Sequence, residues 1–196
     1  MGTAVAVPAN PFIQAESTPQ TTFDTLSPVE GETLQAIVAR LIPTDAHGPG
    51  AIEAQATYYI DQALSNALVA SRQLYADGLA SIDAYARSSR GRVFRELQSE
   101  DQDAILKEME DNSASGFMPD SSSVFEMIRS HTIEGTFSDP YYGGNANFIG
   151  WDLIGYPGVR TVVTPRQQRI DSTPRPVHRS AYDFGRFVKE VLNRGR

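Results

Sequence analysis

Histidines and nearby carboxylates are the side chains of this chain that could perform acid–base or metal chemistry. His47, His131 and His178 lie far apart, and none stands at a spacing typical of metal ligands. His131 and Glu134 share one face of an expected helix, and with Asp139 they would be the candidate residues of a free-standing enzyme. A single i, i+3 pair is more typical of a hydrogen-bonded helix surface than of a catalytic site.

Other motifs for chemistry are missing from the sequence. It has no cysteine, which excludes disulfides, thiolate metal sites and cysteine nucleophiles. It has no GxSxG nucleophile elbow, and the run 143–145 (Gly-Gly-Asn) lacks the spacing and the preceding strand of a phosphate-binding loop. We therefore predict no catalytic residue, no cofactor-binding residue and no metal site in this chain. The acidic run 100–111 is interpreted as a solvated helix face.

Charge divides the 196 residues into an acidic body and a basic end. The net charge is −7, which argues against nucleic acid as the main partner. Nine basic and three acidic residues stand from Arg160 onward, so this end carries +6 while residues 1–159 carry −13. A basic end of this kind either folds back onto its own acidic body or docks on another protein.

Apolar residues at helical spacing run through most of the chain. Leu34, Ile37, Val38 and Leu41, for example, form one apolar stripe. Strand-like alternation is confined to the run 161–164, so the predicted class is mainly α, a small helical bundle. Capping signals at Ser27, Ser99 and Ser123 mark three of the expected helix starts. The expected helices cover about 28–42, 52–68, 74–87, 99–109, 123–137 and 180–193.

Three parts of the chain are expected from these patterns. Residues 1–25 contain three prolines and are predicted to be an extended N-terminal segment. Residues 26–158 are predicted to be the helical domain. Residues 159–196 are predicted to be a basic arm, rich in Pro and Arg, that ends in an amphipathic helix. No apolar run approaches the ~20 residues that span a bilayer, so we expect no direct membrane span.

The stretch 139–158 combines five glycines with the only tryptophan and is predicted to be an irregular loop within the helical domain. Its aromatic area must pack either on the chain's own helices or on a partner, with Trp151 as the main anchor. In the arm, arginines are expected to steer association and the last helix to hold the partner. The candidate partner-binding residues are Tyr141, Tyr142, Asn145, Trp151, Tyr156, Arg166, Arg169, Arg175, Phe184, Phe187, Val191 and Leu192.

The motifs in and around this loop resemble those of a known family. The specific part is the stretch 139–158, with DPYYGGN, GW and GYPG, and the turn 42–54, with IPTD and GPGAIEA, supports it. Together with Ile60-Asp61 in the next expected helix, they are similar to the gluconate 2-dehydrogenase subunit 3 family. The resemblance covers roughly residues 26–158, and both terminal segments lie outside it.

The resemblance implies an accessory role. Members are the small, or gamma, subunits of bacterial membrane-associated dehydrogenases for sugars, sugar acids and glucosides. Such a subunit binds a large catalytic subunit of the glucose–methanol–choline oxidoreductase type, which carries FAD and oxidises an alcohol group of the substrate. Electrons often pass on to a cytochrome c subunit with haem c, whereas the small subunit has no known cofactor.

The resemblance also implies a part in maturation and export. The small subunit is thought to assist folding and export of the catalytic subunit, often by lending a twin-arginine signal. This sequence has no twin-arginine pair near its start. We therefore expect a periplasmic protein whose signal has been removed, with a cytoplasmic protein as the alternative. Two other classes stay open: a free-standing helical enzyme, and a structural interaction protein without a redox link.

Overall fold

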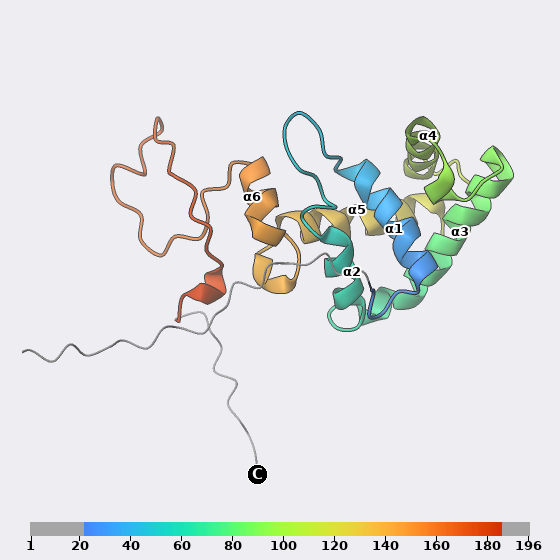
Figure 1. The fold of residues 1–196 in the computed structure, drawn as a ribbon, viewed down its shortest axis with the longest axis horizontal. Helices are drawn as coiled ribbons and strands as arrows, with labels where there is room; N and C mark the ends of the chain where they lie inside the picture. Colours follow the sequence, from blue (N-terminus) through green and yellow to red (C-terminus); the bar gives the residue numbers. More distant parts are fainter. Residues whose placement is uncertain (1–21, 186–196) are drawn as a thin grey trace, which may run out of the picture.

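The computed structural model describes residues 22–185 of the chain. Within that range the chain forms six α-helices, and none of the described residues belongs to a β-strand (Figure 1). The predicted mainly α class is therefore confirmed, and the run 161–164 is irregular. The helices are α1 (Pro28–Leu41), α2 (Ala56–Leu64), α3 (Arg72–Arg90), α4 (Ser99–Glu110), α5 (Ser121–Phe137) and α6 (Ile149–Leu153), and the 3₁₀ turns are η1 (Val69–Ser71), η2 (Phe94–Glu96), η3 (Pro140–Tyr142), η4 (Ala146–Phe148) and η5 (Ala181–Asp183).

The first helix begins where the capping signal predicts it. The hydroxyl of Ser27 accepts a hydrogen bond from the backbone N–H of Glu30 (3.4 Å), and the Glu30 carboxylate accepts one from the N–H of Ser27 (2.7 Å). This capping box satisfies two amide groups that a helix start leaves unpaired. Arg72 of α3 donates two further hydrogen bonds to the same carboxylate, at 2.9 and 3.0 Å, so the start of α1 is fastened to α3.

Two other predicted capping boxes are wrong. Ser99 is the first residue of α4 and caps nothing; Gln98 precedes it without a side-chain cap. The cap of α5 is Asp120, three residues before the predicted Ser123. The Asp120 carboxylate accepts hydrogen bonds from the N–H of Ser123 (2.8 Å) and from the hydroxyls of both Ser122 (2.7 Å) and Ser123 (2.9 Å). Asp120 has the extended backbone of an N-cap and α5 begins at the next residue, so Ser123 lies inside the first turn.

Two helices also differ in length from the prediction. Helix α2 starts at Ala56 because Gln55 adopts a left-handed conformation with φ +60°, so Ile52 lies in a turn and is exposed. Helix α3 is longer than the expected 74–87, because one 3₁₀ turn leads directly into it and Gly91 ends it at φ +80°. Apolar spacing alone does not mark either boundary.

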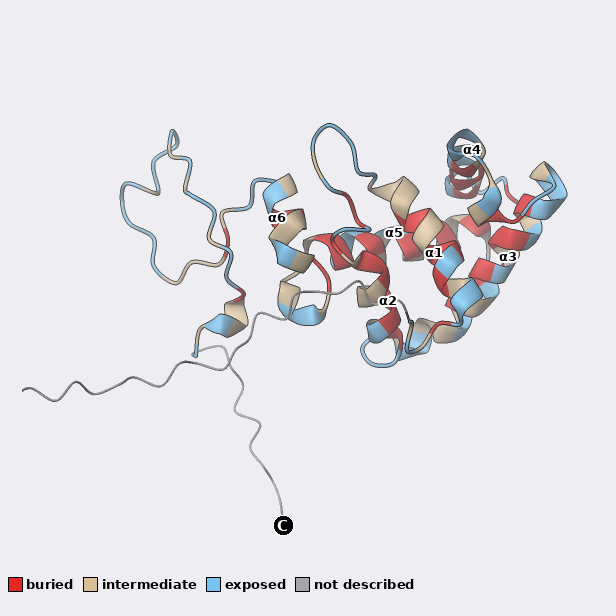
Figure 2. Cartoon of the chain, viewed as in Figure 1, coloured by how far each residue is buried: buried red, intermediate tan, exposed pale blue. Residues whose placement is uncertain are grey.

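Helix α5 is the centre of the bundle and contacts α1, α2, α3, α4 and α6. In Figure 1 it runs behind α1 and α2, and Figure 2 shows that the buried faces of the helices turn toward it. Burial of apolar surface in this core is the main force that holds the helices together. The largest fully buried side chains are Tyr75, Phe94, Leu34, Ile37, Ile60, Leu64, Ile82, Ile105, Met109, Ile128, Val38 and Val124.

The carboxylate of Asp61 on α2 fastens the start of the described chain to the bundle. It is buried and accepts hydrogen bonds from three consecutive backbone N–H groups, those of residues 24, 25 and 26, at 2.7, 3.0 and 2.7 Å. Its neighbour Ile60 is fully buried in the core. The Ile60-Asp61 motif therefore combines a core residue with a cap for the incoming chain, and it is structural.

We expect Asp61→Ala to lower the free energy of unfolding by at least about 2 kcal/mol, because several N–H groups then lose their acceptor inside the protein. Asp77→Ala is the matched control, since Asp77 is exposed on α3 and should change stability by less than about 0.5 kcal/mol. Urea unfolding of both variants measures the difference. Equal stability of the two variants would show that the cap is not needed.

Candidate functional site

The stretch 139–158 packs against the end of α5 and is more regular than predicted. It contains two 3₁₀ turns and the short helix α6, which the sequence pattern did not reveal because its apolar run is too short (Figure 1). The segment lies at one end of the bundle, away from α3 and α4. We call residues 139–158 the aromatic loop.

The side chain of Asn145 organises the aromatic loop. It is fully buried; its amide nitrogen donates to the carbonyl oxygen of Ser138 (2.8 Å) and its amide oxygen accepts from the N–H of Gly150 (2.8 Å). The backbone N–H of Asn145 donates to the carbonyl oxygen of Gly135 inside α5 (2.7 Å). The prediction that Asn145 contacts a partner is therefore wrong, because both its amide groups are used inside the chain.

Close backbone contact explains two of the glycines. A Cβ atom at Gly144 would overlap the carbonyl oxygen of Gly135, and a Cβ atom at Gly150 would overlap that of Thr136. Both carbonyls belong to the last turn of α5. The loop backbone thus lies directly on the helix end, at a distance that only glycine permits.

Trp151 anchors the loop from inside, as predicted. Its side chain is 5% exposed, and its indole N–H donates to the carbonyl oxygen of Phe137 (2.9 Å). The rings of Phe148 and Tyr156 pack against it, with centroids 5.3 and 4.8 Å away. Because Trp151 is buried in its own chain, its prediction as a partner-contacting residue is wrong.

Other aromatic residues of the loop face solvent. Tyr141 is 62% exposed, Tyr142 51% and Tyr156 38%. Tyr182 of the arm stacks on Tyr141 at a centroid distance of 3.7 Å, and its hydroxyl lies 2.7 Å from that of Tyr142. The role of Tyr141, Tyr142 and Tyr156 in partner binding stays a prediction. Sequence reasoning missed Tyr182, since nothing local pairs it with residues 40 positions earlier.

Part of the basic arm folds back onto the aromatic loop. The N–H of Val177 donates to the carbonyl oxygen of Pro157 (3.1 Å), and the N–H of Ala181 donates to the Asp139 carboxylate (2.8 Å). His178 lies 2.8 Å from the Asp152 carboxylate through Nε2 and stacks on Phe148 with a centroid distance of 5.0 Å. Of the two possibilities for the arm, residues 177–184 therefore follow the first and pack on their own body.

The helix predicted from Ser180 does not form over the described residues. Ser180 and Asp183 make a capping box, but the turn η5 ends at Asp183. Phe184 is extended, with φ −99° and ψ 119°, and the Arg179 guanidinium lies 4.2 Å from the centre of its ring. Phe187, Val191 and Leu192 lie outside the described residues.

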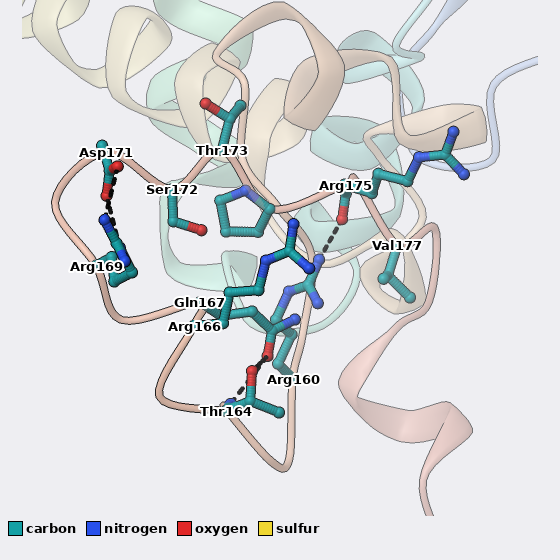
Figure 3. Close-up of a pocket in the computed structure, with 11 residues that line it drawn as sticks. Arg160, Thr164, Arg166, Gln167, Arg169, Asp171, Ser172, Thr173, Arg175 and Val177 are labelled. Atoms are coloured by element: carbon teal, nitrogen blue, oxygen red, sulfur yellow. Dashed lines mark hydrogen bonds and ion pairs between the residues drawn. The ribbon is translucent and has the colours of Figure 1, made fainter.

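The predicted arginines of the arm gather around one cavity of about 800 Å³ (Figure 3). Arg166, Arg169 and Arg175 line it together with Arg160, which sequence reasoning did not single out. Their common place in a Pro-rich segment was visible in the sequence, but the closed path of the backbone that brings them together was not.

The three residues of the alternative enzyme hypothesis serve separate structural contacts. Nδ1 of His131 lies 2.9 Å from the Tyr75 hydroxyl, and the Glu134 carboxylate accepts a hydrogen bond of 3.1 Å from Tyr59. Asp139 caps the turn η3 and holds the arm. None of the three lines the arginine cavity or a second, shallower cavity between α4 and α5. The geometry thus gives no support to an acid–base centre at these residues.

Burial shifts the pKa values of His131 and of Tyr75, the residue that it contacts. It lowers the pKa of His131 below its ordinary value, although the nearby Glu134 carboxylate opposes this shift. It also raises the pKa of Tyr75, and it raises that of Tyr59, beside the same carboxylate, to about 12. Tyr75 therefore keeps its proton beside a neutral imidazole, and the tautomer of His131 decides which of the two groups donates the hydrogen bond between them.

Residues 22–185 hold neither a cluster of metal ligands nor a membrane-spanning helix. No three His, Asp or Glu side chains within this range gather closely enough to hold a metal ion. No helix in the same range has the length and apolar character needed to cross a bilayer. The described surface instead carries exposed tyrosines at the aromatic loop and arginines in the arm.

The sequence matches a known protein family. Residues 28–158 match the family described as Gluconate 2-dehydrogenase subunit 3, and the chain belongs to that family. Membership implies a subunit of a multi-subunit dehydrogenase complex. The match runs from the first residue of α1 to the last residue of the aromatic loop, so the arm lies outside it. Neither a curated protein nor a solved structure matches the chain.

We expect Trp151→Ala to cost about 3–5 kcal/mol of stability, because it removes a packed ring and leaves a cavity. Trp151→Phe should cost less, since it keeps most of the apolar area, although it loses part of the ring and the hydrogen bond to the carbonyl oxygen of Phe137. Tyr141→Ala is the control for an exposed aromatic residue and should cost under about 1 kcal/mol. If chemical denaturation gave all three variants the same stability, the loop would not be anchored by Trp151.

The lowered pKa of His131 predicts a pH-dependent stability. Below about pH 6.5 the unfolded chain protonates this histidine more readily than the folded chain does. The free energy of unfolding is therefore highest above this pH, and it falls as the pH decreases through the folded-state pKa. The loss is at most about 1.4 kcal/mol per pH unit. Urea unfolding at pH 7.5 and 5.5 should show a smaller decrease for His131→Gln than for wild type. Parallel decreases would contradict the prediction.

Proposed function

We propose that this chain is the non-catalytic small subunit of a flavin-dependent dehydrogenase that acts on sugars, sugar acids or glucosides. Its partner would be a large catalytic subunit of the glucose–methanol–choline oxidoreductase type that carries FAD. In this proposal the chain stabilises the catalytic subunit and assists its maturation or export to the periplasm. A cytochrome c subunit with haem c would be a third component in some complexes.

Membership of the subunit 3 family is the observation that carries the proposal. The form of the described chain supports it in two ways. First, Tyr141 and Tyr142 keep more than half of their surface exposed beside a tightly packed loop, and such rigid tyrosines are common anchors at protein interfaces. Second, the residues best suited to acid–base chemistry have structural partners of their own.

The proposed division of labour is physically simple. The buried core and Trp151 make a stable platform, and the tyrosines and arginines on its outside provide contacts with a partner. Aromatic rings with few rotatable bonds lose little conformational entropy when they are buried at an interface. The substrate and the flavin would then be bound by the large subunit, and this chain would affect turnover through the amount of folded enzyme.

Co-expression with a candidate flavin subunit tests the proposal. We expect the two chains to co-elute in size-exclusion chromatography with a flavin absorbance spectrum, and the chain alone to elute without flavin. Tyr141→Ala combined with Tyr142→Ala should lower recovery of the complex, whereas Val69→Ala, an exposed apolar residue on η1, should not.

Three results would contradict the proposal. The first is stoichiometric FAD on the isolated chain, and the second is oxidation of a sugar acid by it. The third is a flavin subunit that folds, is exported and turns over equally well without this chain.

A further inference from the structure

The backbone of residues 160–177 forms a nearly closed ring, which we call the arginine loop. Its two ends meet where the Arg160 guanidinium donates to the carbonyl oxygen of Arg175 and where the Val177 N–H donates to Pro157. The ring surrounds the cavity of about 800 Å³, and Figure 3 shows arginine side chains around it. The remaining lining is mostly polar, with Thr164, Gln167, Ser172 and Thr173.

Positive charge in the arginine loop is not balanced within the described chain. The loop holds four arginines and one aspartate, a net charge of +3. Asp171 pairs with Arg169 through hydrogen bonds of 3.1 and 3.2 Å. No acidic side chain among residues 22–185 forms an ion pair with Arg160, Arg166 or Arg175. The Nε–H of Arg160 is buried without an acceptor. An unpaired buried donor and several like charges around one cavity both favour a bound anion.

The chemistry of that anion follows from the guanidinium group. Arginine presents a planar set of donors that matches carboxylate or phosphate oxygens in pairs. A volume of about 800 Å³ is in the range of sites for ligands much larger than one oxyanion. Three arginines without an ion-pair partner line this volume, so they fit a ligand with several anionic groups.

Apolar residues of the same loop distinguish a protein ligand from a free anion. Val162 is 74% exposed, and Ile170 is fully exposed beside Arg169. A site for a small anion gains nothing from exposed apolar side chains in the same loop. Protein interfaces, in contrast, combine arginine with exposed apolar residues that become buried on binding.

We propose that the arginine loop binds an acidic segment of a partner protein. Carboxylate side chains of that segment pair with Arg160, Arg166 and Arg175, and apolar side chains between them contact Val162 and Ile170. Arg169 is already paired with Asp171 and shapes the ring. The proposal rests on the proposed function in one respect only, the identity of the protein that carries the acidic segment, which is the flavin subunit.

A labelled peptide tests the site on the full chain. Fluorescence anisotropy would measure binding of fluorescein-labelled Glu-Glu-Leu-Glu-Glu-Leu, with Gln-Gln-Leu-Gln-Gln-Leu as the uncharged control peptide. We expect the acidic peptide to bind and the double variant Arg166→Gln, Arg175→Gln to weaken it about tenfold or more. Arg92→Gln removes an exposed arginine far from the loop and should change the dissociation constant less than about twofold. Unchanged melting temperatures show that the variants stay folded.

Other results would overturn the proposal. Equal peptide binding by wild type and the double variant would place the ligand elsewhere. Binding of inorganic phosphate at constant ionic strength, without binding of the peptide, would identify a site for small oxyanions. Self-association that the double variant abolishes would identify the acidic body of a second copy as the ligand. Peptide binding without assembly with the flavin subunit would support the acidic-segment site while contradicting the proposed function, and assembly without peptide binding would do the reverse.

Discussion

The contact between Asn145 and the last turn of α5 is the constraint on which the candidate site depends. One side chain satisfies a carbonyl group before it and an N–H group after it, while its own N–H reaches back to Gly135. Asn145, Asn147 and Phe148 all take left-handed backbone conformations, which asparagine tolerates and phenylalanine rarely adopts. The hydrogen bonds of Asn145 and the packing of Phe148 on Trp151 offset this strain. Without them the aromatic loop would have no fixed path.

The arm depends on this path in turn. His178, Ala181 and Tyr182 contact residues that the aromatic loop has already positioned, namely Asp152, Phe148, Asp139 and the two exposed tyrosines. The arm buries few apolar side chains of its own. Its position is therefore set by the aromatic loop, and it contributes little to the stability of the bundle. The molecule is thus built in layers from α5 outward, with the proposed contact surfaces in the last layer.

The parts predicted correctly from sequence are those that local physics determines. The apolar stripe and the capping box of α1 involve residues three or four positions apart, and the anchoring role of Trp151 follows from its size in a glycine-rich stretch. The errors arose where distant residues decide. Asn145 was assigned to a surface because nothing near it in sequence shows that Gly135 allows the backbone to approach. The return of the arm depends on Asp139, 42 residues before the N–H that it binds. The start of α5 was misplaced because Asp120 and Ser123 are both good N-cap residues, and the motif alone does not show which one precedes the first turn.

The closure of the arginine loop at its base has a consequence for how this segment can vary. Val177 is hydrogen bonded to Pro157, and Gly158, with φ +82°, lies so close to the Val177 carbonyl that a Cβ atom would not fit. Because these contacts join the two ends, the residues between them can change in number at little cost, about 0.6 kcal/mol for each doubling of a flexible loop. The tip can therefore be lengthened, shortened or rewritten without disturbing the region 28–158 that defines the family. Partner choice could then evolve in this segment independently of the scaffold that carries it.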